Sequence, residues 1–196
     1  MHKLEATDAL ILVDVQNDFM PGGALAVPRG DEIIARLNAL VAEFERRGLP
    51  VVATRDWHPA NHCSFSAQGG PWPPHCVAAT AGADFHRALA VSDRTRIVSK
   101  ATSPERDAYS GFDHTDLAGW LQERGVERLL VGGLATDYCV LHTVLDGLSA
   151  GFAVSVLDDA IRAVNVDAGD GARAIARMRA AGARITASTA FLGLDA

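Results

Sequence analysis

Three reactive side chains stand at widely separated points of the chain, and together they suit attack on a carbonyl carbon by a thiol. Asp14 follows a run of apolar residues, Lys100 closes a second run, and Cys139 lies in a turn that contains glycines. A carboxylate can accept the proton of a thiol and later deliver it to a departing amine, while a neighbouring ammonium favours the ionised forms of both acids. Each residue alone also has an ordinary interpretation, as a loop-capping aspartate, a solvated lysine or a buried, unreactive cysteine.

The turn that contains Cys139, residues 132–140, is typical of a strand that passes into a helix. Free backbone N–H groups and the positive end of a helix can lower the pKa of a thiol there and can stabilise an oxyanion. The chain has three cysteines, Cys63, Cys76 and Cys139, which cannot all pair with one another. The polar start of the sequence does not resemble a secretory leader, so we expect reduced thiols in the cytoplasm.

A second group of residues suits a metal ion. Asp56 and His58 are two positions apart, and His75 lies on a segment stiffened by prolines. One carboxylate and two imidazoles, with water at the remaining positions, suit one divalent ion such as zinc, iron or manganese. An isolated Asp-x-His pair is a weak signal, and spacing alone leaves His62 and His86 as alternative ligands.

The elements that must position these residues follow from periodicity. Short apolar runs alternate with helical patterns, which predicts an α/β fold with a mainly parallel sheet. We predict strands at 9–13, 50–54, 95–99, 128–133, 152–157 and 184–187, and helices at 31–47, 116–124, 136–150 and 168–181. Gly48 is expected to end the first helix, and Thr115 to cap the second. Open α/β sheets bind ligands at the carboxyl ends of their strands, near the reversal of strand order.

One long segment, residues 56–85, has no periodicity. It contains several glycines and prolines together with three histidines, two tryptophans and two cysteines. An irregular segment of this length is uncommon in a compact domain unless it is functional or disordered. Its histidines and tryptophans favour a functional segment.

The composition excludes several other classes of protein. The chain of 196 residues suits one domain, residues 1–196, and its 48% hydrophobic and 21% charged residues are those of a globular protein. A net charge of −6 with scattered basic residues argues against a nucleic-acid partner. No apolar run approaches the roughly 18 residues of a membrane helix. We therefore expect a small-molecule substrate and no membrane partner, with a homo-oligomer left open.

Four segments together resemble the nicotinamidase/pyrazinamidase family of the isochorismatase-like cysteine hydrolases. They are Val13–Phe19, Thr54–Pro59, Trp72–Val77 and Gly132–Val140, in the order of the family and across most of the chain. The resemblance implies a Rossmann-like three-layer fold with a six-stranded, mainly parallel sheet flanked by helices. It also implies a catalytic triad formed by Asp14, Lys100 and Cys139. The metal site that it implies is formed by Asp56, His58 and His75.

The resemblance implies further roles near these two groups. Several members of the family have another histidine at the position of Ser64, so Ser64 is expected to act weakly or indirectly on the metal, and His62 and His86 to lie outside the ligand set. A cis peptide bond is implied at Leu134-Ala135, so that the N–H groups of Ala135 and Cys139 face the oxyanion.

The expected substrate site is aromatic. Phe19 and Trp72 match the walls that sandwich a pyridine ring in the family, and Tyr109 matches a tyrosine beside the substrate. The implied activity is hydrolysis of nicotinamide to nicotinate and ammonia through a cysteine thioester, with the metal positioning the ring and pyrazinamide as a second substrate. The alternatives are another cysteine amidase of the superfamily and a non-catalytic metal-binding protein on the same fold.

Overall fold

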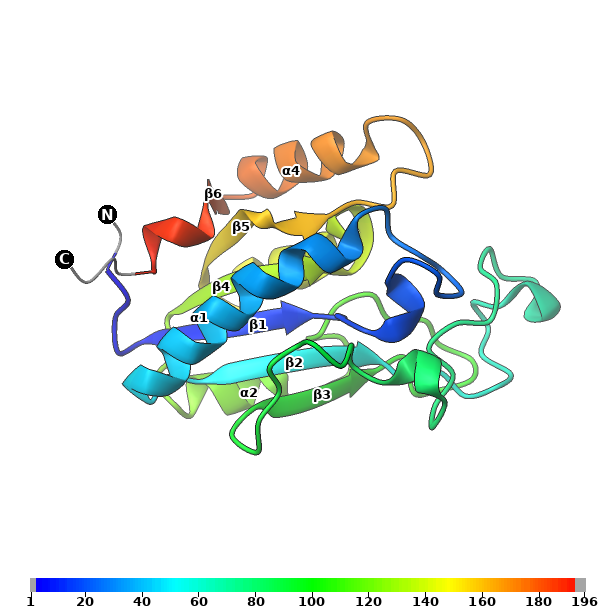
Figure 1. Ribbon diagram of the computed structural model, residues 1–196, viewed down its shortest axis with the longest axis horizontal. Helices are drawn as coiled ribbons and strands as arrows, with labels where there is room; N and C mark the ends of the chain where they lie inside the picture. The colour runs from blue at the N-terminus through cyan, green and yellow to red at the C-terminus, as the bar shows by residue number, and fades with distance from the viewer. Residues whose placement is uncertain (1–2, 193–196) are drawn as a thin grey trace.

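The protein is built on one parallel sheet, as the computed structural model of residues 3–192 shows (Figure 1). The outermost residues of the predicted domain, 1–2 and 193–196, lie outside the described part. The sheet has six strands in the order β3-β2-β1-β4-β5-β6, and every pairing is parallel. The strands are β1 (Asp8–Val13), β2 (Val51–Asp56), β3 (Arg96–Lys100), β4 (Arg128–Leu134), β5 (Ala153–Arg162) and β6 (Arg184–Thr186). The predicted α/β fold is confirmed, with a sheet that is wholly rather than mainly parallel.

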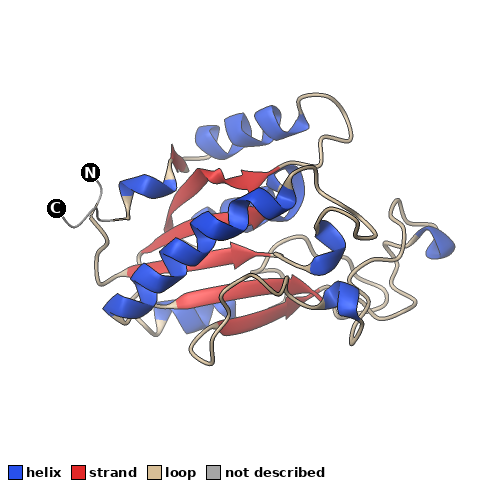
Figure 2. Cartoon of the chain, viewed as in Figure 1, coloured by secondary structure: helices blue, strands red, loops and turns tan. Residues whose placement is uncertain are grey.

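Helices cover both faces of this sheet (Figure 2). They are α1 (Ile34–Arg47), α2 (Leu117–Gln122), α3 (Leu141–Ser149) and α4 (Asp170–Ala180). Successive residues of β1 point to opposite faces: Leu10 and Leu12 pack in one apolar core with α1, while Ile11 and Val13 pack in a second core with the other three helices. This arrangement gives the three layers that the resemblance implied. Among residues 3–192, no helix has the length and apolar character needed to cross a membrane.

Helix α1 shows how directly the sequence codes for this packing. Its buried side chains recur at helical spacing, from Ile34 and Leu37 to Phe44. Gly48 ends the helix in the left-handed conformation with φ 70°, which glycine adopts without the steric cost of a Cβ atom. The predicted end of this helix is therefore confirmed.

Several predicted elements differ in detail. The predicted helix at 136–150 forms with nearly those bounds, but its first turn, Thr136–Val140, is π-helical and only the following α3 is α-helical. Strand β5 continues to Arg162 because its pairing with β4 shifts register between Val131 and Gly133, which accommodates the polar residues that interrupt the apolar run. Helix α2 has Asp116 rather than Thr115 at its N-cap position, although the Thr115 hydroxyl accepts a hydrogen bond from the Leu117 N–H at 3.3 Å.

Candidate active site and metal centre

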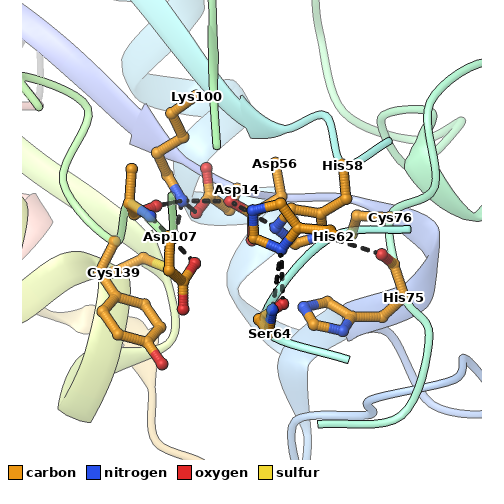
Figure 3. Close-up of polar contacts among 12 residues, drawn as sticks. Asp14, Asp56, His58, His62, Ser64, His75, Cys76, Lys100, Asp107 and Cys139 are labelled. Carbon is orange, nitrogen blue, oxygen red and sulfur yellow. Dashed lines mark hydrogen bonds and ion pairs between the residues drawn. The ribbon is translucent and has the colours of Figure 1, made fainter. Parts of the chain in front are cut away.

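The three predicted catalytic side chains meet where the strand order reverses. Strand β1 lies between β2 and β4; Asp14 follows β1, Lys100 ends β3, and Cys139 lies in the turn after β4. The Lys100 Nζ atom is 2.9 Å from Asp14 Oδ2 and 3.4 Å from Cys139 Sγ (Figure 3). All three residues are buried. The fold thus brings together residues that are up to 125 positions apart in sequence (139 minus 14).

Sheet register sets the position of Asp14. Its neighbour Val13 pairs with Thr54 of β2, and the Thr54 hydroxyl donates a hydrogen bond to Asp14 Oδ1 at 2.6 Å. The Asp14 N–H also donates to the Thr54 carbonyl at 3.2 Å. Sequence reasoning missed Thr54, although a polar residue inside a buried apolar strand was a usable signal.

Lys100 lies between two carboxylates. Its ammonium contacts the carboxylates of Asp14 and Asp56, and it donates to the Ala108 carbonyl at 3.2 Å. Burial alone would lower the pKa of Lys100, but the two carboxylates outweigh burial and raise that pKa well above its usual value. Lys100 is therefore a permanent cation in the site.

The pKa of the Cys139 thiol lies well above its usual value, so the expectation that the turn lowers it is wrong. Burial is the main cause, because the thiolate loses its hydration; the Lys100 ammonium opposes this effect, and the carboxylates of Asp14 and Asp56 add to it. Burial also raises the pKa of Asp14, with Lys100 again opposing. The pKa values of both the Asp14 carboxyl and the Cys139 thiol are therefore raised by burial, and the Lys100 ammonium opposes the shift in each.

The three predicted metal ligands also lie together. One ligand atom from each of Asp56, His58 and His75 can be chosen so that all three atoms lie within 4.8 Å of one another. The Nδ1 of His58 donates to the His75 carbonyl at 3.0 Å, and the Nδ1 of His75 donates to the Pro73 carbonyl at 2.8 Å, because a carbonyl oxygen can only accept. Each imidazole is left with Nε2 for an ion.

The chemistry of this donor set fits a divalent ion. Burial lowers the pKa of His58 to about 3, so the ring stays in its neutral, ligating form. A carboxylate with two imidazoles, each held by a carbonyl behind it, is a usual arrangement for zinc and for other divalent transition metals. The three possible ligands lie directly beside the triad, because Asp56 contacts both groups. Its carboxylate contacts the Lys100 ammonium, and its Oδ1 is 3.8 Å from His58 Nε2.

The competing histidines are engaged elsewhere. His62 uses both ring nitrogens: Nε2 donates to the Arg106 carbonyl at 3.0 Å, and Nδ1 accepts from the Ser64 hydroxyl at 2.7 Å. Its ring stacks on His58 at 4.3 Å between centroids. His86 accepts a hydrogen bond from the nearby Ala88 N–H. Ser64 thus touches His62 rather than the three grouped ligands, which fits the indirect role expected for it.

Gln16 is a positioning residue that sequence reasoning missed. Its side chain is fully buried, and its amide donates to the carbonyls of Asp56 at 2.8 Å and Ala83 at 2.9 Å, while its Oε1 accepts from the Asp56 N–H at 2.8 Å. These two bonds to the backbone of Asp56 fix the residue that contacts the Lys100 ammonium and also belongs to the metal set. The signal in the sequence was a polar residue three positions after the end of β1.

The predicted substrate-binding residues line one small cavity over Cys139. Trp72 and Tyr109 are joined there by a hydrogen bond of 3.1 Å from the indole N–H to the phenolic oxygen. The peptide bond between Leu134 and Ala135 is cis, as the resemblance implied. Three lining residues were not predicted: Leu25, Tyr138 and Val164. The full lining comprises Phe19, Leu25, Asp56, Trp72, His75, Tyr109, Ala135, Tyr138, Cys139 and Val164.

A parallel α/β fold that carries a buried acid, cation and thiol beside a carboxylate–imidazole set has the parts that a metal-associated cysteine hydrolase needs. The family model described as the isochorismatase domain matches residues 8–190, so the chain belongs to the isochorismatase family. This membership confirms the resemblance found in the sequence.

The relatives carry more specific names. Over 198 residues the chain is 42% identical to the nicotinamidase of Escherichia coli (strain K12), with 90% of this chain and 93% of the relative covered. Among solved structures, the pyrazinamidase of Pyrococcus horikoshii in complex with zinc is 49% identical with a TM-score of 0.88, covering 92% of this chain and 99% of its own. PnC1 from L. infantum in complex with nicotinate is 38% identical with a TM-score of 0.90, covering 97% and 98%.

Proposed function

We propose that the protein is a nicotinamidase that hydrolyses nicotinamide to nicotinate and ammonia and also accepts pyrazinamide. The observation that carries this proposal is the shared position of Asp56, which contacts the Lys100 ammonium of the triad and belongs to the metal set. A thiol and a pyridine-binding ion can therefore act on one small ring held in one cavity. The chain matches relatives named nicotinamidase and pyrazinamidase over most of their length, which supports an aromatic-ring carboxamide as the substrate.

The chain's own residues supply the acid–base and nucleophilic steps. Asp14 takes the proton of Cys139, and the thiolate attacks the carboxamide carbon. The N–H groups of Ala135 and Cys139 are the proposed donors to the oxyanion, each worth about 10²–10³ in rate. Asp14 returns the proton to the leaving ammonia and then activates the water that hydrolyses the thioester. Lys100 stays protonated and balances the negative charge that moves between Asp14 and Cys139.

The metal would be held by Asp56, His58 and His75, and its chemistry is to hold the ring nitrogen, directly or through water, and so to orient the amide. The aromatic side chains complete this orientation. Phe19 and Trp72 are proposed as the two walls of a slot for the pyridine ring, with Tyr109 beside them. Holding a small planar substrate in this way removes orientational entropy from the barrier.

An alternative function is hydrolysis of a carbamoyl or ureido amide by the same thiol. The metal set beside the cavity favours a pyridine substrate instead, because an acyclic amide offers no ring nitrogen to an ion. A second alternative, a non-catalytic metal-binding protein, leaves the buried contact between Lys100 and the Cys139 sulfur without a role. Nicotinamide is therefore the substrate that uses every part of the site.

A cytoplasmic location is proposed for the protein. Cys63, Cys76 and Cys139 are all free thiols, which persist in a reducing compartment. Neither a nucleic acid nor a membrane is proposed as a partner. Assembly into a homo-oligomer stays a prediction, and light scattering of the purified protein at several concentrations tests it.

Ammonia release from nicotinamide tests the function directly. The purified protein is assayed as isolated, after treatment with a chelator, and after zinc, iron or manganese is added back. We expect release that falls on chelation, returns with at least one ion, and is absent in Cys139→Ala. Hydrolysis of carbamoyl or ureido amides in place of nicotinamide would support the rival amidase, and no hydrolysis of any amide would support the non-catalytic alternative.

A further inference from the structure

One wall of the cavity comes from the loop between β5 and α4, residues 163–169. Val164 of this loop lines the cavity beside Cys139. The N–H groups of Val164 and Asn165 both donate to the carboxylate of Asp137, at 3.0 Å and 2.8 Å. Asp137 lies in the π-helical turn two residues before Cys139. The turn that carries the Cys139 thiol therefore also holds the loop 163–169 against the cavity.

The loop has one further anchor at this point and is exposed beyond it. Asn165 has φ 53°, and its side-chain oxygen accepts the Gly171 N–H at 2.9 Å. A Cβ atom on Gly171 would lie 2.6 Å from the Cβ of Ala163, so this approach depends on glycine. Residues 165–169 are exposed, with Val166 at 60%. The position of Val164 thus depends on the two bonds from Asp137 at one side and on Asn165 at the other.

We propose that Asp137 is a positioning residue that holds Val164 against the cavity and thereby limits the size of the ring that the site accepts. This inference rests on the proposed function and names its specificity determinant. A carboxylate that accepts two backbone N–H groups makes charge-assisted bonds, which are stronger than neutral ones. One methylene group more or less in an apolar pocket changes discrimination by about 10–200-fold, so a small displacement of Val164 has a measurable effect.

Asp137→Asn tests the proposal with little change of size, because the amide nitrogen cannot accept one of the two N–H groups. We expect the KM for nicotinamide to rise several-fold while kcat stays within about twofold, since the triad is untouched. For a series of nicotinamides methylated at each open ring carbon, kcat/KM relative to nicotinamide should rise about tenfold for at least one position. An unchanged selectivity across the whole series overturns the proposal.

Val164→Ala tests the same wall without touching Asp137. It should shift selectivity in the same direction, and the double variant should shift it no further than the larger single change, because both act through one side chain. Fully additive effects would mean that Asp137 does not act through Val164. If Asp137→Asn fails to fold, an unchanged selectivity in Val164→Ala alone refutes the size limit.

Asp170→Asn is the matched control. Its carboxylate also accepts an N–H of this loop, from Asp167 at 2.8 Å, but at the end next to α4. It should leave the KM and the selectivity unchanged; a shift as large as that of Asp137→Asn would point to general loosening of the loop and overturn the proposal.

Amide hydrogen exchange gives a readout that needs no substrate. The segment 163–166 should exchange faster in Asp137→Asn than in the wild type, and in Asp170→Asn it should not. If the wild type fails to hydrolyse nicotinamide, the proposed function fails while this measurement still tests the contact. Unchanged exchange in Asp137→Asn overturns the proposal whatever the substrate is.

Discussion

The two halves of the site are held in place by different means. In the triad half, register places the residues: Val13 pairs with Thr54, and Asp56 with Lys100, across neighbouring parallel strands. In the metal half, His58 and His75 lie beyond the strands, and hydrogen bonds to carbonyl groups orient their rings. The positions of Asp14 and Lys100 therefore form with the sheet and Cys139 follows it in the turn after β4. The metal geometry depends instead on local bonds between irregular segments.

Loop contacts compensate for the absence of regular structure in the metal half. Asp18 accepts the N–H of Cys76, next to His75, at 2.7 Å. A Cβ atom on Gly82 would lie 2.2 Å from the same carboxylate, so three segments meet at this point only because Gly82 has no side chain. Such contacts orient the ligands without a ladder of strand hydrogen bonds, and we expect the bound ion to contribute to the order of this half.

Charge connects the two halves. Asp14 and Asp56 face one ammonium, that of Lys100, so the buried cluster carries an excess of negative charge when both acids are ionised. A divalent ion on Asp56 would balance this excess. Four variants can separate the halves or show that they act as one.

Cys139→Ala should remove the chemistry and leave the metal half intact. We expect kcat to fall by about 10⁴–10⁶ because the nucleophile is absent. The metal content of the purified variant, measured by elemental analysis, should match that of the wild type, since Asp56, His58 and His75 are unchanged. Loss of the ion together with the activity would show that the two halves are not separable.

Lys100→Met should destabilise the fold, because it leaves two buried carboxylates without their cation. Removing one partner of a buried ion pair costs about 3–5 kcal/mol, and urea unfolding measures the loss. Zinc should restore part of it by balancing Asp56. The control is Asp116→Asn, which breaks the exposed pair with Arg96 on the same strand and should cost about 1 kcal/mol or less. A Lys100→Met loss as small as that of the control contradicts the charge argument.

His75→Ala should weaken the metal half and spare the triad. Changes in the residues behind metal ligands weaken metal affinity by about 10–100-fold, so loss of a direct ligand should exceed that range. The KM for nicotinamide should then rise more than kcat falls, because the ion orients the ring. Metal titration followed by steady-state kinetics at saturating ion checks this expectation, and unchanged metal affinity would remove His75 from the ligand set.

Ser64→Ala should have the smallest effect of the four. The hydroxyl donates to His62, whose ring stacks on His58, so the change reaches the metal through two side chains. We expect metal affinity to fall by about tenfold or less, with kcat unchanged at saturating ion. An effect equal to that of His75→Ala would instead make Ser64 a direct ligand.

The fold class and the residue types of the site follow from sequence patterns alone. Buried strands appear in a sequence as apolar runs, and functional residues of a parallel sheet follow the carboxyl ends of its strands. Both rules use local sequence only, and together they indicated Asp14 and Lys100. Residue types also suggested Asp56, His58 and His75 as metal ligands, and the resemblance then favoured them over His62 and His86; the structure brings these three together. Local patterns and the order of the motifs are enough to predict these features, because the prediction does not depend on which elements pack together.

The preference for His75 over His62 as the third ligand comes from the packed molecule, because the Arg106 carbonyl that binds the His62 ring lies 44 residues away in sequence. Only the tertiary structure likewise decided that the Cys139 thiol has a raised rather than a lowered pKa, since burial is a property of the packed molecule. The roles of Gln16 and Asp137 also depend on backbone groups distant in sequence. Register, desolvation and long-range hydrogen bonds arise only when the layers pack, so they leave no periodic trace in the chain.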